Sequence, residues 1–343
     1  MWDGRLGSSP QRHLSEVPIT TTFEFPMKVS RLVYAGFLSI AVLGLYLHAQ
    51  IAMARDDSAK PPSESAILFT MSAPVDEVRL NFTVTDKGGN FIKGLSSDDF
   101  RLFDNESPPE RMIRFQAHVD SPMSVVMLFD ISSSIRYRFE FEQKAANHFL
   151  KHVLRPGIDR AAIISFGSDV HEVQSMTGDI NLLTSAVSHL KPGGDTALHD
   201  AVIRAAKDLS SQPPDTRKII IILSDGADTI SHAGSKDCMV AAISSEATII
   251  VVDASVPSES NSPGQRFLRK VAENSGGFVL PARLDSELKT SFNTINSVLR
   301  NQYSLTYKPS LFQRDGDFRA VELTTRKTGM IVHSRNGYYA KRD

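Results

Sequence analysis

Apolar and polar residues follow two different patterns along this chain. Between Val78 and Val84 they alternate one by one, which predicts a strand with a single buried face. The runs 125–129 and 219–223 are instead continuously apolar. Continuous short runs of this kind are typical of strands that are buried on both faces, as in parallel sheets. The chain therefore combines two kinds of β structure.

Between residues 121 and 300, predicted strands alternate with predicted helices. The strands are expected at 125–129, 159–166, 169–175, 218–223, 248–252 and 277–280, and the helices at 180–190, 197–209, 236–244, 265–274 and 285–300. Gly167-Ser168 is a hairpin signal between the second and third of these strands. Such alternation implies right-handed crossovers and an α/β fold with a doubly wound, mainly parallel sheet.

Short β segments flank this α/β block on both sides. On the N-terminal side the pattern predicts strand 78–84, a turn at 86–89, a return strand beginning at Phe91-Ile92, a capped helical turn at 96–99, and strands 101–103 and 112–115. On the C-terminal side it predicts strands at 303–307, 321–323 and 330–332. Neither group is long enough to bury a core of its own. We expect both to join in one small β-sandwich-like domain, interrupted by the α/β block.

The N-terminal region has the layout of a targeting segment. Residues 32–54 contain no Lys, Arg, Asp or Glu, Lys28 and Arg31 precede them, and small residues end the run. This favours a signal peptide with Met27 as the true start, and the alternative is an uncleaved membrane anchor through 32–54. Both interpretations place the rest of the chain outside the cytoplasm, either secreted or periplasmic, or anchored in the membrane.

The pattern as a whole gives an expected domain organisation. It comprises an N-terminal extension (1–26, untranslated if Met27 is the true start), a signal peptide or anchor (27–54), a linker (55–67), an N-terminal β segment (68–118), the α/β domain (122–300) and a C-terminal β segment (301–343). The net charge of -1 argues against nucleic acid as a partner. The single cysteine, Cys238, excludes an internal disulfide framework and a cysteine-rich zinc site, and we expect it to be a small buried side chain in a helix.

The candidate ligand side chains lie at the end of the first apolar run. Asp130 stands where a central parallel strand would stop, and Ser132 and Ser134 follow at alternate positions, so that a loop can point all three the same way. Ligands of open α/β sheets bind in the crevice beyond the carboxyl ends of the strands. A set of oxygen ligands suits a hard cation such as Mg²⁺ or Mn²⁺.

An Asp-x-Ser-x-Ser motif after an apolar strand resembles the von Willebrand factor A domain with its metal-ion-dependent adhesion site. The resemblance covers residues 122–300 and implies two further site residues from later loops. Thr196, in a glycine-rich loop that opens a helix, and Asp225, after the run 219–223, match those positions. The implied metal site is Asp130, Ser132, Ser134, Thr196 and Asp225. In family members the hydroxyls are the main direct ligands, and the acids act partly through water.

Simpler interpretations exist for each residue taken alone. Ser and Asp are good helix N-caps and turn formers, so any one of the five could have only that role. Three nearby acids (Asp195, Asp200 and Asp228) match no motif position, and we expect them to be surface groups or to support the ligands. His199 lies one helical turn from Thr196 and could touch a ligand, but a lone exposed histidine usually has no role, and we expect none here.

The resemblance implies a function as well as a fold. The flanking β segments look like those of bacterial secreted proteins of the acidobacterial "VWFA-related" type. This implies a non-enzymatic protein in which Mg²⁺ bridges the site to an Asp or Glu of an unknown protein partner. The alternative is a metal-assisted hydrolase or phosphoryl-transfer enzyme, since an aspartyl nucleophile also occupies a strand end. Ser132 stands where such an enzyme has a second acid, and the sequence has neither a Gly-x-Ser-x-Gly elbow nor a P-loop. A structural envelope protein that has lost its metal is a third possibility, against which the five intact positions argue. We therefore predict no catalytic residue.

Overall fold

The computed structural model describes residues 77–117, 120–255, 261–282, 284–340 and 342. The predicted targeting segment (27–54) and linker (55–67) lie outside these residues, so both stay predictions. In the part of the chain that is described, no helix is both long enough and apolar enough to cross a membrane.

A six-stranded sheet forms the centre of the α/β part. Its strands are β4 (Met123–Asp130), β5 (Arg160–Phe166), β6 (Val170–Thr177), β7 (Arg217–Ser224), β8 (Thr248–Asp253) and β9 (Phe278–Pro281). Their order across the sheet is β6-β5-β4-β7-β8-β9. Neighbouring strands are parallel except β6, which runs antiparallel to β5. The prediction of a mainly parallel, doubly wound sheet is confirmed.

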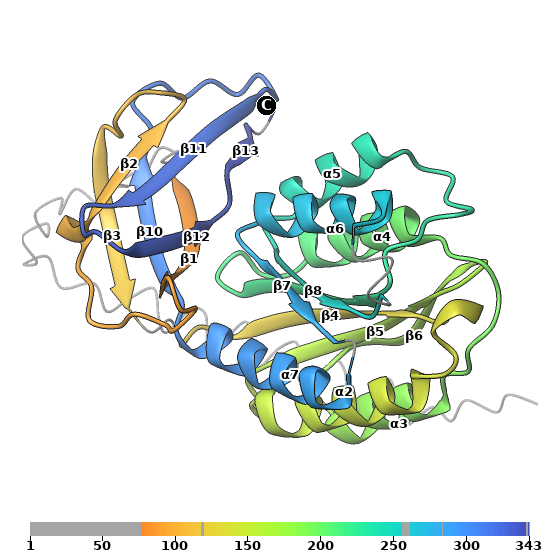
Figure 1. Ribbon diagram of the computed structural model, residues 1–343. Coiled ribbons are helices and arrows are strands. Elements are labelled where there is room, and N and C mark those ends of the chain that lie inside the picture. Colours follow the sequence, from red (N-terminus) through yellow and green to blue (C-terminus); the bar gives the residue numbers. More distant parts are fainter. Residues whose placement is uncertain (1–76, 118–119, 256–260, 283, 341, 343) are drawn as a thin grey trace, which may run out of the picture. The chain divides into compact units, whose positions relative to one another are not determined.

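Helices cover both faces of this sheet, as Figure 1 shows. One face carries α2 (Phe139–Val153), α3 (Ile180–His189) and α7 (Asp285–Arg300), and the other carries α4 (Leu198–Ser210), α5 (Ser235–Ser244) and α6 (Pro263–Asn274). In β4, Val125, Met127 and Phe129 pack into the first core, and Val126 and Leu128 into the second. The apolar run is continuous because each face of the strand meets its own layer of helices.

The β segments on the two sides of the α/β part pair with each other. One sheet has the order β12-β1-β10-β3, from β12 (Met330–Ser334), β1 (Val78–Asp86), β10 (Tyr303–Lys308) and β3 (Arg111–Ala117). The second has the order β13-β11-β2, from β13 (Gly337–Tyr339), β11 (Phe318–Thr325) and β2 (Phe100–Asp104). The expected association of the N-terminal and C-terminal strands is therefore observed.

The core of this β-sandwich is aromatic and contains one buried acid. The rings of Phe82 and Tyr303 stack with centroids 5.5 Å apart. The Oδ2 atom of buried Asp104 accepts hydrogen bonds from the hydroxyls of Tyr307 (2.6 Å) and Tyr338 (2.9 Å). Burial, with Asp104 alongside, raises the pKa of both tyrosines. These bonds join a strand of the N-terminal segment to two strands of the C-terminal segment.

One predicted element does not form. Phe91 makes a single bridge to Thr85, and no strand follows. The chain turns inward instead: Leu95 is buried, and its N–H donates to the Tyr303 hydroxyl over 3.3 Å. The predicted capped turn does form, as η1 (Ser97–Asp99). Cys238 is a free, buried thiol in α5, as expected.

Candidate functional site

The first loop of the site leaves β4 at Asp130 and leads into the short helix η2 (Ser133–Ile135). Asp130 is fully buried, and both of its carboxylate oxygens accept hydrogen bonds. The Ser132 N–H donates to Oδ1 over 2.8 Å, and the Ser224 hydroxyl donates to Oδ2 over 2.7 Å. The hydroxyl oxygens of Ser132 and Ser134 lie 2.9 Å apart. The motif thus places two hydroxyls side by side, above a carboxylate that fixes the backbone of the loop.

The Asp130 carboxyl is in an unusual electrostatic position. Burial raises its pKa to about 6, although hydrogen bonds from Ser132 and Ser224 counteract this rise, and the charge of Asp225 adds to it. Titratable groups with perturbed pKa values beside a cleft are characteristic of functional sites. A positive charge close to Asp130 would favour its ionised form.

The second loop brings Thr196 to the same place. The Ser133 N–H donates to the Gly194 carbonyl over 3.2 Å, which joins this loop to the first. The Thr196 N–H donates to the Thr229 hydroxyl over 3.0 Å, and the Thr229 N–H donates back to the Thr196 carbonyl over 2.9 Å. Thr196 is therefore held by its backbone from both sides.

The third loop follows β7 and carries Asp225. The Asp225 carboxylate accepts a hydrogen bond from the Ala227 N–H over 3.1 Å, and the Gln265 side chain donates to the Asp225 carbonyl over 2.6 Å. Gly226 has a φ of +86°, and a Cβ atom on Gly264 would lie 1.8 Å from the Gly226 carbonyl oxygen. Two glycines therefore allow α6 to touch this loop directly.

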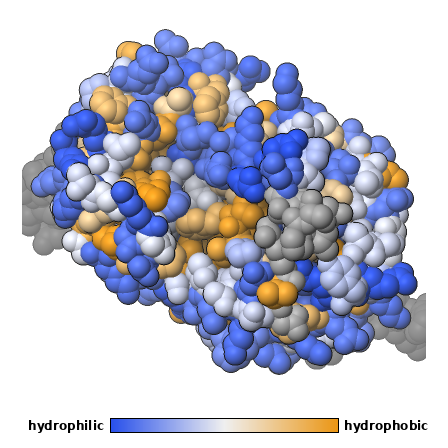
Figure 2. Space-filling model, in the orientation of Figure 1, coloured by the Kyte–Doolittle hydropathy of each residue, from blue (hydrophilic) through white to orange (hydrophobic). Residues whose placement is uncertain are grey.

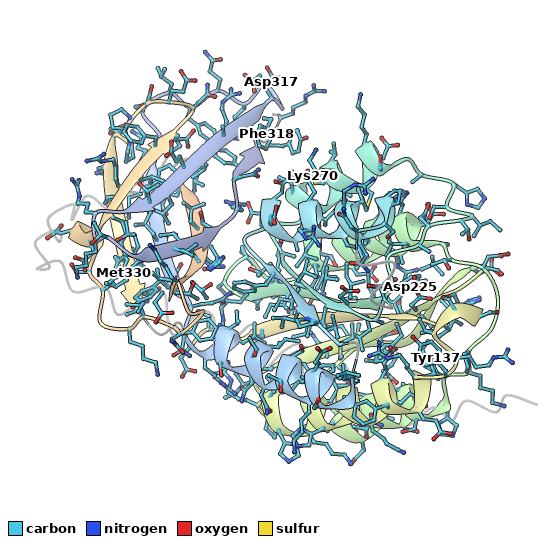
Figure 3. The ribbon with its side chains drawn as sticks, in the orientation of Figure 1. Tyr137, Asp225, Lys270, Asp317, Phe318 and Met330 are labelled. Atoms are coloured by element: carbon cyan, nitrogen blue, oxygen red, sulfur yellow. The ribbon has the colours of Figure 1, made fainter. Side chains whose placement is uncertain are left out.

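These loops enclose a cavity of about 830 Å³. Its walls include Ser132, Ser134, Thr196 and Asp225. Asp130 does not line the cavity and lies buried behind the first loop. The structure therefore brings all five predicted residues to one end of the sheet, where Figure 3 labels Asp225. We call these five residues the strand-end site.

The simpler capping interpretation accounts for only part of this arrangement. Ser132 is the N-cap residue of η2, but its side chain makes no capping hydrogen bond. Helix α4 begins after Ala197, so the N-cap position is not that of Thr196. Asp225 does stabilise its own turn, through the bond to Ala227. The two serines and the threonine therefore have no capping role that would explain their positions.

Neighbouring polar groups support the site from outside. Asp200 accepts hydrogen bonds from the backbone N–H groups of His232 and Ala233, and these bonds lower its pKa although burial opposes them. His199 lines the cavity, with Nδ1 3.2 Å from Asp228 Oδ2 and its ring against that of Phe267. Asp228 thus fixes His199, and Asp200 fixes the loop at residues 232–233. The histidine has a defined place in the wall, which the sequence did not indicate.

Sequence reasoning also missed two groups that support the strand-end site. Ser224 donates to Asp130, and the Gln265 side chain donates to the Asp225 carbonyl. Ser224 is adjacent to Asp225 in the sequence, which is a weak signal. Gln265 lies on a helix with no motif around it, and only the folded chain brings it to the site.

The donor set of the strand-end site fits a hard divalent cation. Asp130 and Asp225 supply two negative charges, and Ser132, Ser134 and Thr196 supply neutral oxygens. Mg²⁺ and Mn²⁺ prefer such oxygen ligands, whereas soft metals prefer sulfur or imidazole. Among the described residues, no group of three or more His, Cys, Asp or Glu side chains could hold a metal ion. A cation here would therefore depend on hydroxyl oxygens.

Comparison with known families agrees with the fold. The family model of the von Willebrand factor type A domain matches residues 125–227. With the topology described above, this match gives the α/β part of the chain the von Willebrand factor type A fold. No curated protein matches the chain by sequence at a significant level.

Solved structures of similar fold are only distantly related. The PilB minor pilin from Streptococcus sanguinis is 14% identical, with a TM-score of 0.43, 57% of this chain covered and 63% of that one. A von Willebrand factor type A protein from Catenulispora acidiphila is 15% identical, with a TM-score of 0.46 and coverage of 72% and 74%. The vWF domain of the type V pili tip protein Mfa5 from Porphyromonas gingivalis is 14% identical, with a TM-score of 0.44 and coverage of 53% and 96%. This chain thus spans less than two thirds of the PilB chain, and these likenesses are too distant to support a functional inference.

Proposed function

We propose that the chain is a non-enzymatic, extracytoplasmic protein-binding protein. In this proposal the strand-end site holds Mg²⁺ or Mn²⁺, to which a partner protein contributes an Asp or Glu side chain. The observation that carries the proposal is the shared cavity: Ser132, Ser134, Thr196 and Asp225 open onto one space, with the Asp130 carboxylate buried directly behind them.

Each residue has a separate task in this proposal. The three hydroxyls contribute oxygens without charge. Asp130 and Asp225 balance the charge of a divalent cation, and Asp130 also fixes the first loop through the Ser132 N–H. The cation supplies Lewis acidity for one more hard ligand, and a carboxylate is the natural choice because it adds a full charge at short range. Loops of the partner that exclude water would strengthen this contact.

The position of Asp130 favours binding over catalysis. An aspartyl nucleophile must present an oxygen to its substrate, but both Asp130 oxygens accept hydrogen bonds inside the protein. The enzyme alternative is tested with generic phosphate and ester substrates. Turnover that is abolished by Asp130→Ala would establish an enzyme and contradict the proposal.

The extracytoplasmic location rests on the uncharged run 32–54 and on Lys28 and Arg31, which precede it. Fractionation of expressing cells and N-terminal sequencing of the product test it. A product that stays in the cytoplasm with an intact N-terminus would contradict this part of the proposal.

The exposed apolar side chains are spread over the surface. On the face shown in Figure 2 hydrophilic side chains predominate, and apolar ones form smaller patches toward the centre and left. The exposed large apolar side chains of the described residues belong to many separate elements, from Met112 on β3 to Ile331 on β12. We therefore place recognition at the cavity and its rim.

Calorimetric titration of the whole chain with Mg²⁺ tests the site. We expect one bound ion, and we expect Ser132→Ala combined with Ser134→Ala to abolish binding because both hydroxyl ligands are lost. Ser133→Ala is the control in the same loop: it removes only an exposed hydroxyl that donates to the Gly194 carbonyl over 3.4 Å, so the Kd should change far less than in the double variant. Undiminished binding in the double variant would contradict the site assignment.

Partner binding is tested next. Pull-downs from the native envelope are compared in Mg²⁺ and in EDTA, and candidate Asp or Glu residues of a captured partner are then exchanged for Ala. Binding that survives both chelation and this exchange would leave the strand-end site with a structural role only.

A further inference from the structure

Glu142 is buried without a hydrogen-bond partner. It lies in the first turn of α2, directly after the loop that carries Ser132 and Ser134, and it is 1% exposed. Within the described part of the chain, neither of its carboxylate oxygens has a hydrogen-bond partner. Glu140, in the same turn, is exposed, as expected for a glutamate in a surface helix.

The surroundings of Glu142 are charged. Arg138, one turn earlier, is also buried, and its Nη1 donates to the Ala254 carbonyl over 3.0 Å. Burial raises the pKa of Glu142 to about 8, the Arg138 charge counteracts this rise, and the charges of Asp130 and Asp225 add to it. Glu142 is thus within electrostatic reach of both acids of the strand-end site.

Apart from Arg138, the neighbours of Glu142 on α2 do not call for an acid. The buried residues around it on the helix include Phe139, Ala146 and Phe149. Burying a polar group without a hydrogen bond costs roughly 1–3 kcal/mol, and a charged group costs more. The Arg138 charge offsets part of this cost, but neither Glu142 oxygen is hydrogen-bonded to it within the described residues, so the acid points to a functional role.

The charge balance indicates what that role is. When ionised, Asp130, Asp225 and Glu142 carry three negative charges, and Arg138 carries one positive charge. The net charge of this group is then -2, which a single divalent cation neutralises. Glu142 does not itself line the cavity, but its two oxygens have no hydrogen-bond partner among the described residues and can accept from a water between them and such a cation. Mg²⁺ retains several of its waters in proteins.

We propose that Glu142 is a positioning residue of the cation site, which orients the hydration water of the cation from the side of α2. This inference rests on the proposed function, because it assigns a further residue to the same site. It adds a third carboxylate, outside the five motif positions, and a helix that the motif does not include.

The test is the substitution Glu142→Gln in the whole chain, followed by calorimetric titration with Mg²⁺. Residues that orient a metal's surroundings typically contribute 10–100-fold to affinity, so we expect the Kd to rise by at least tenfold. The melting temperature of the metal-free protein should stay the same or rise, because an unpaired buried acid has been removed. Glu140→Gln, in the same turn, is the matched control and should leave the Kd unchanged.

A second variant distinguishes the effect of the negative charge from a structural effect of the substitution. Glu142→Asp keeps the carboxylate on a shorter side chain and should retain part of the affinity that Glu142→Gln loses. A Kd unchanged by Glu142→Gln, while Ser132→Ala with Ser134→Ala abolishes binding, would overturn the role of Glu142 alone. A lower melting temperature of metal-free Glu142→Gln with an unchanged Kd would show a structural role instead. Absence of Mg²⁺ binding by the wild-type chain would overturn the proposed function and this inference together.

Discussion

At the scale of single residues, two carboxyl groups beside the cavity are shaped by burial. Asp130 retains two hydrogen-bond donors, so its pKa rises only to about 6, whereas Glu142 has none, and its pKa rises to about 8. Their ordinary values are 3.8 and 4.5. Both acids therefore hold a proton more tightly in the folded protein than in the unfolded chain.

This difference predicts how stability depends on pH in the absence of metal. Between about pH 4.5 and pH 8 these two carboxyl groups bind more protons in the folded state than in the unfolded state, so their contribution to the free energy of unfolding falls as the pH rises. We expect them to lower it by on the order of 5 kcal/mol between pH 5 and pH 8.5, and burial of His333, which lowers its pKa, offsets a part of this loss. Urea denaturation at a series of pH values in EDTA measures it.

The variant Glu142→Gln cannot titrate at this position and provides the control. In this variant the free energy of unfolding should fall much less above pH 6 than in the wild type. The smaller fall that is due to Asp130 should remain. A wild-type protein whose stability stays flat or increases over this range would contradict the prediction.

The motif residues of this site could be predicted from the sequence, but the buried residues around them could not. Asp130 and Asp225 are recognisable because each follows an apolar strand. Glu142 is not, because two glutamates in the first turn of a helix are normally exposed and favoured by the helix dipole. Its buried neighbour Arg138 donates to the Ala254 carbonyl in the loop after β8, and that contact joins residues far apart in the sequence.

At the scale of elements, the contact between α6 and the loop after β7 sets the shape of the cavity. Gly264→Ala would place a Cβ atom 1.8 Å from the Gly226 carbonyl oxygen, so the loop and the helix must separate. We expect a loss of stability of about 2 kcal/mol or more and weaker Mg²⁺ binding, because Asp225 moves with its loop. Thermal unfolding and calorimetry measure the two effects.

Gly193→Ala is the matched control for this prediction. Gly193 lies in the second loop of the same cavity wall, and a Cβ atom there would meet no atom within 4 Å. Its stability and Mg²⁺ affinity should stay near those of the wild type. Equal effects of the two substitutions would show that the contact between Gly226 and Gly264 does not shape the site.

Most elements could be predicted from hydrophobic periodicity. The largest exception is α2 (Phe139–Val153), which no predicted helix covered, and two shorter segments were also missed or wrongly predicted. The return strand at Phe91-Ile92 is absent because the chain turns inward to bury Leu95. Tertiary packing, and not the local pattern, determines this conformation. The short strand β13 has only three residues, and its pairing with β11 defines it. Such short pairings leave no periodic signal in the sequence.

At the scale of the whole molecule, the β-sandwich depends on both segments that flank the α/β part. In the four-stranded sheet β1 pairs with β10 and β12, and β3 pairs with β10. A chain that ends at Asn301 would therefore leave β1, β2 and β3 without their main partners. We expect limited proteolysis to cut within residues 78–117 of this truncated chain, while the α/β part resists. Protection of residues 78–117 would contradict the shared sandwich.

The buried acid of the sandwich gives a milder test of the same dependence. Tyr307→Phe removes one of the two hydroxyl donors to Asp104 and should cost about 1–3 kcal/mol of stability. Mg²⁺ affinity should not change, because the sandwich contributes no residue to the strand-end site. Tyr339→Phe is the control, since no hydrogen bond of its hydroxyl is present in the described part of the chain. A Tyr307→Phe variant as stable as Tyr339→Phe would show that Asp104 does not depend on this bond.

The pairing of Val78 with Tyr307 also has a consequence for the order of events during synthesis. A ribosome releases β1, β2 and β3 first, and then the entire α/β part, before β10 exists. Until then the early strands keep unpaired edges, which are prone to aggregation. Folding of the α/β part shortens the distance between Ala117 and Tyr303, which pair across β3 and β10, and so lowers the entropy cost of closing the sandwich. A substitution that slows folding of the α/β part therefore prolongs the exposure of strands that it never touches.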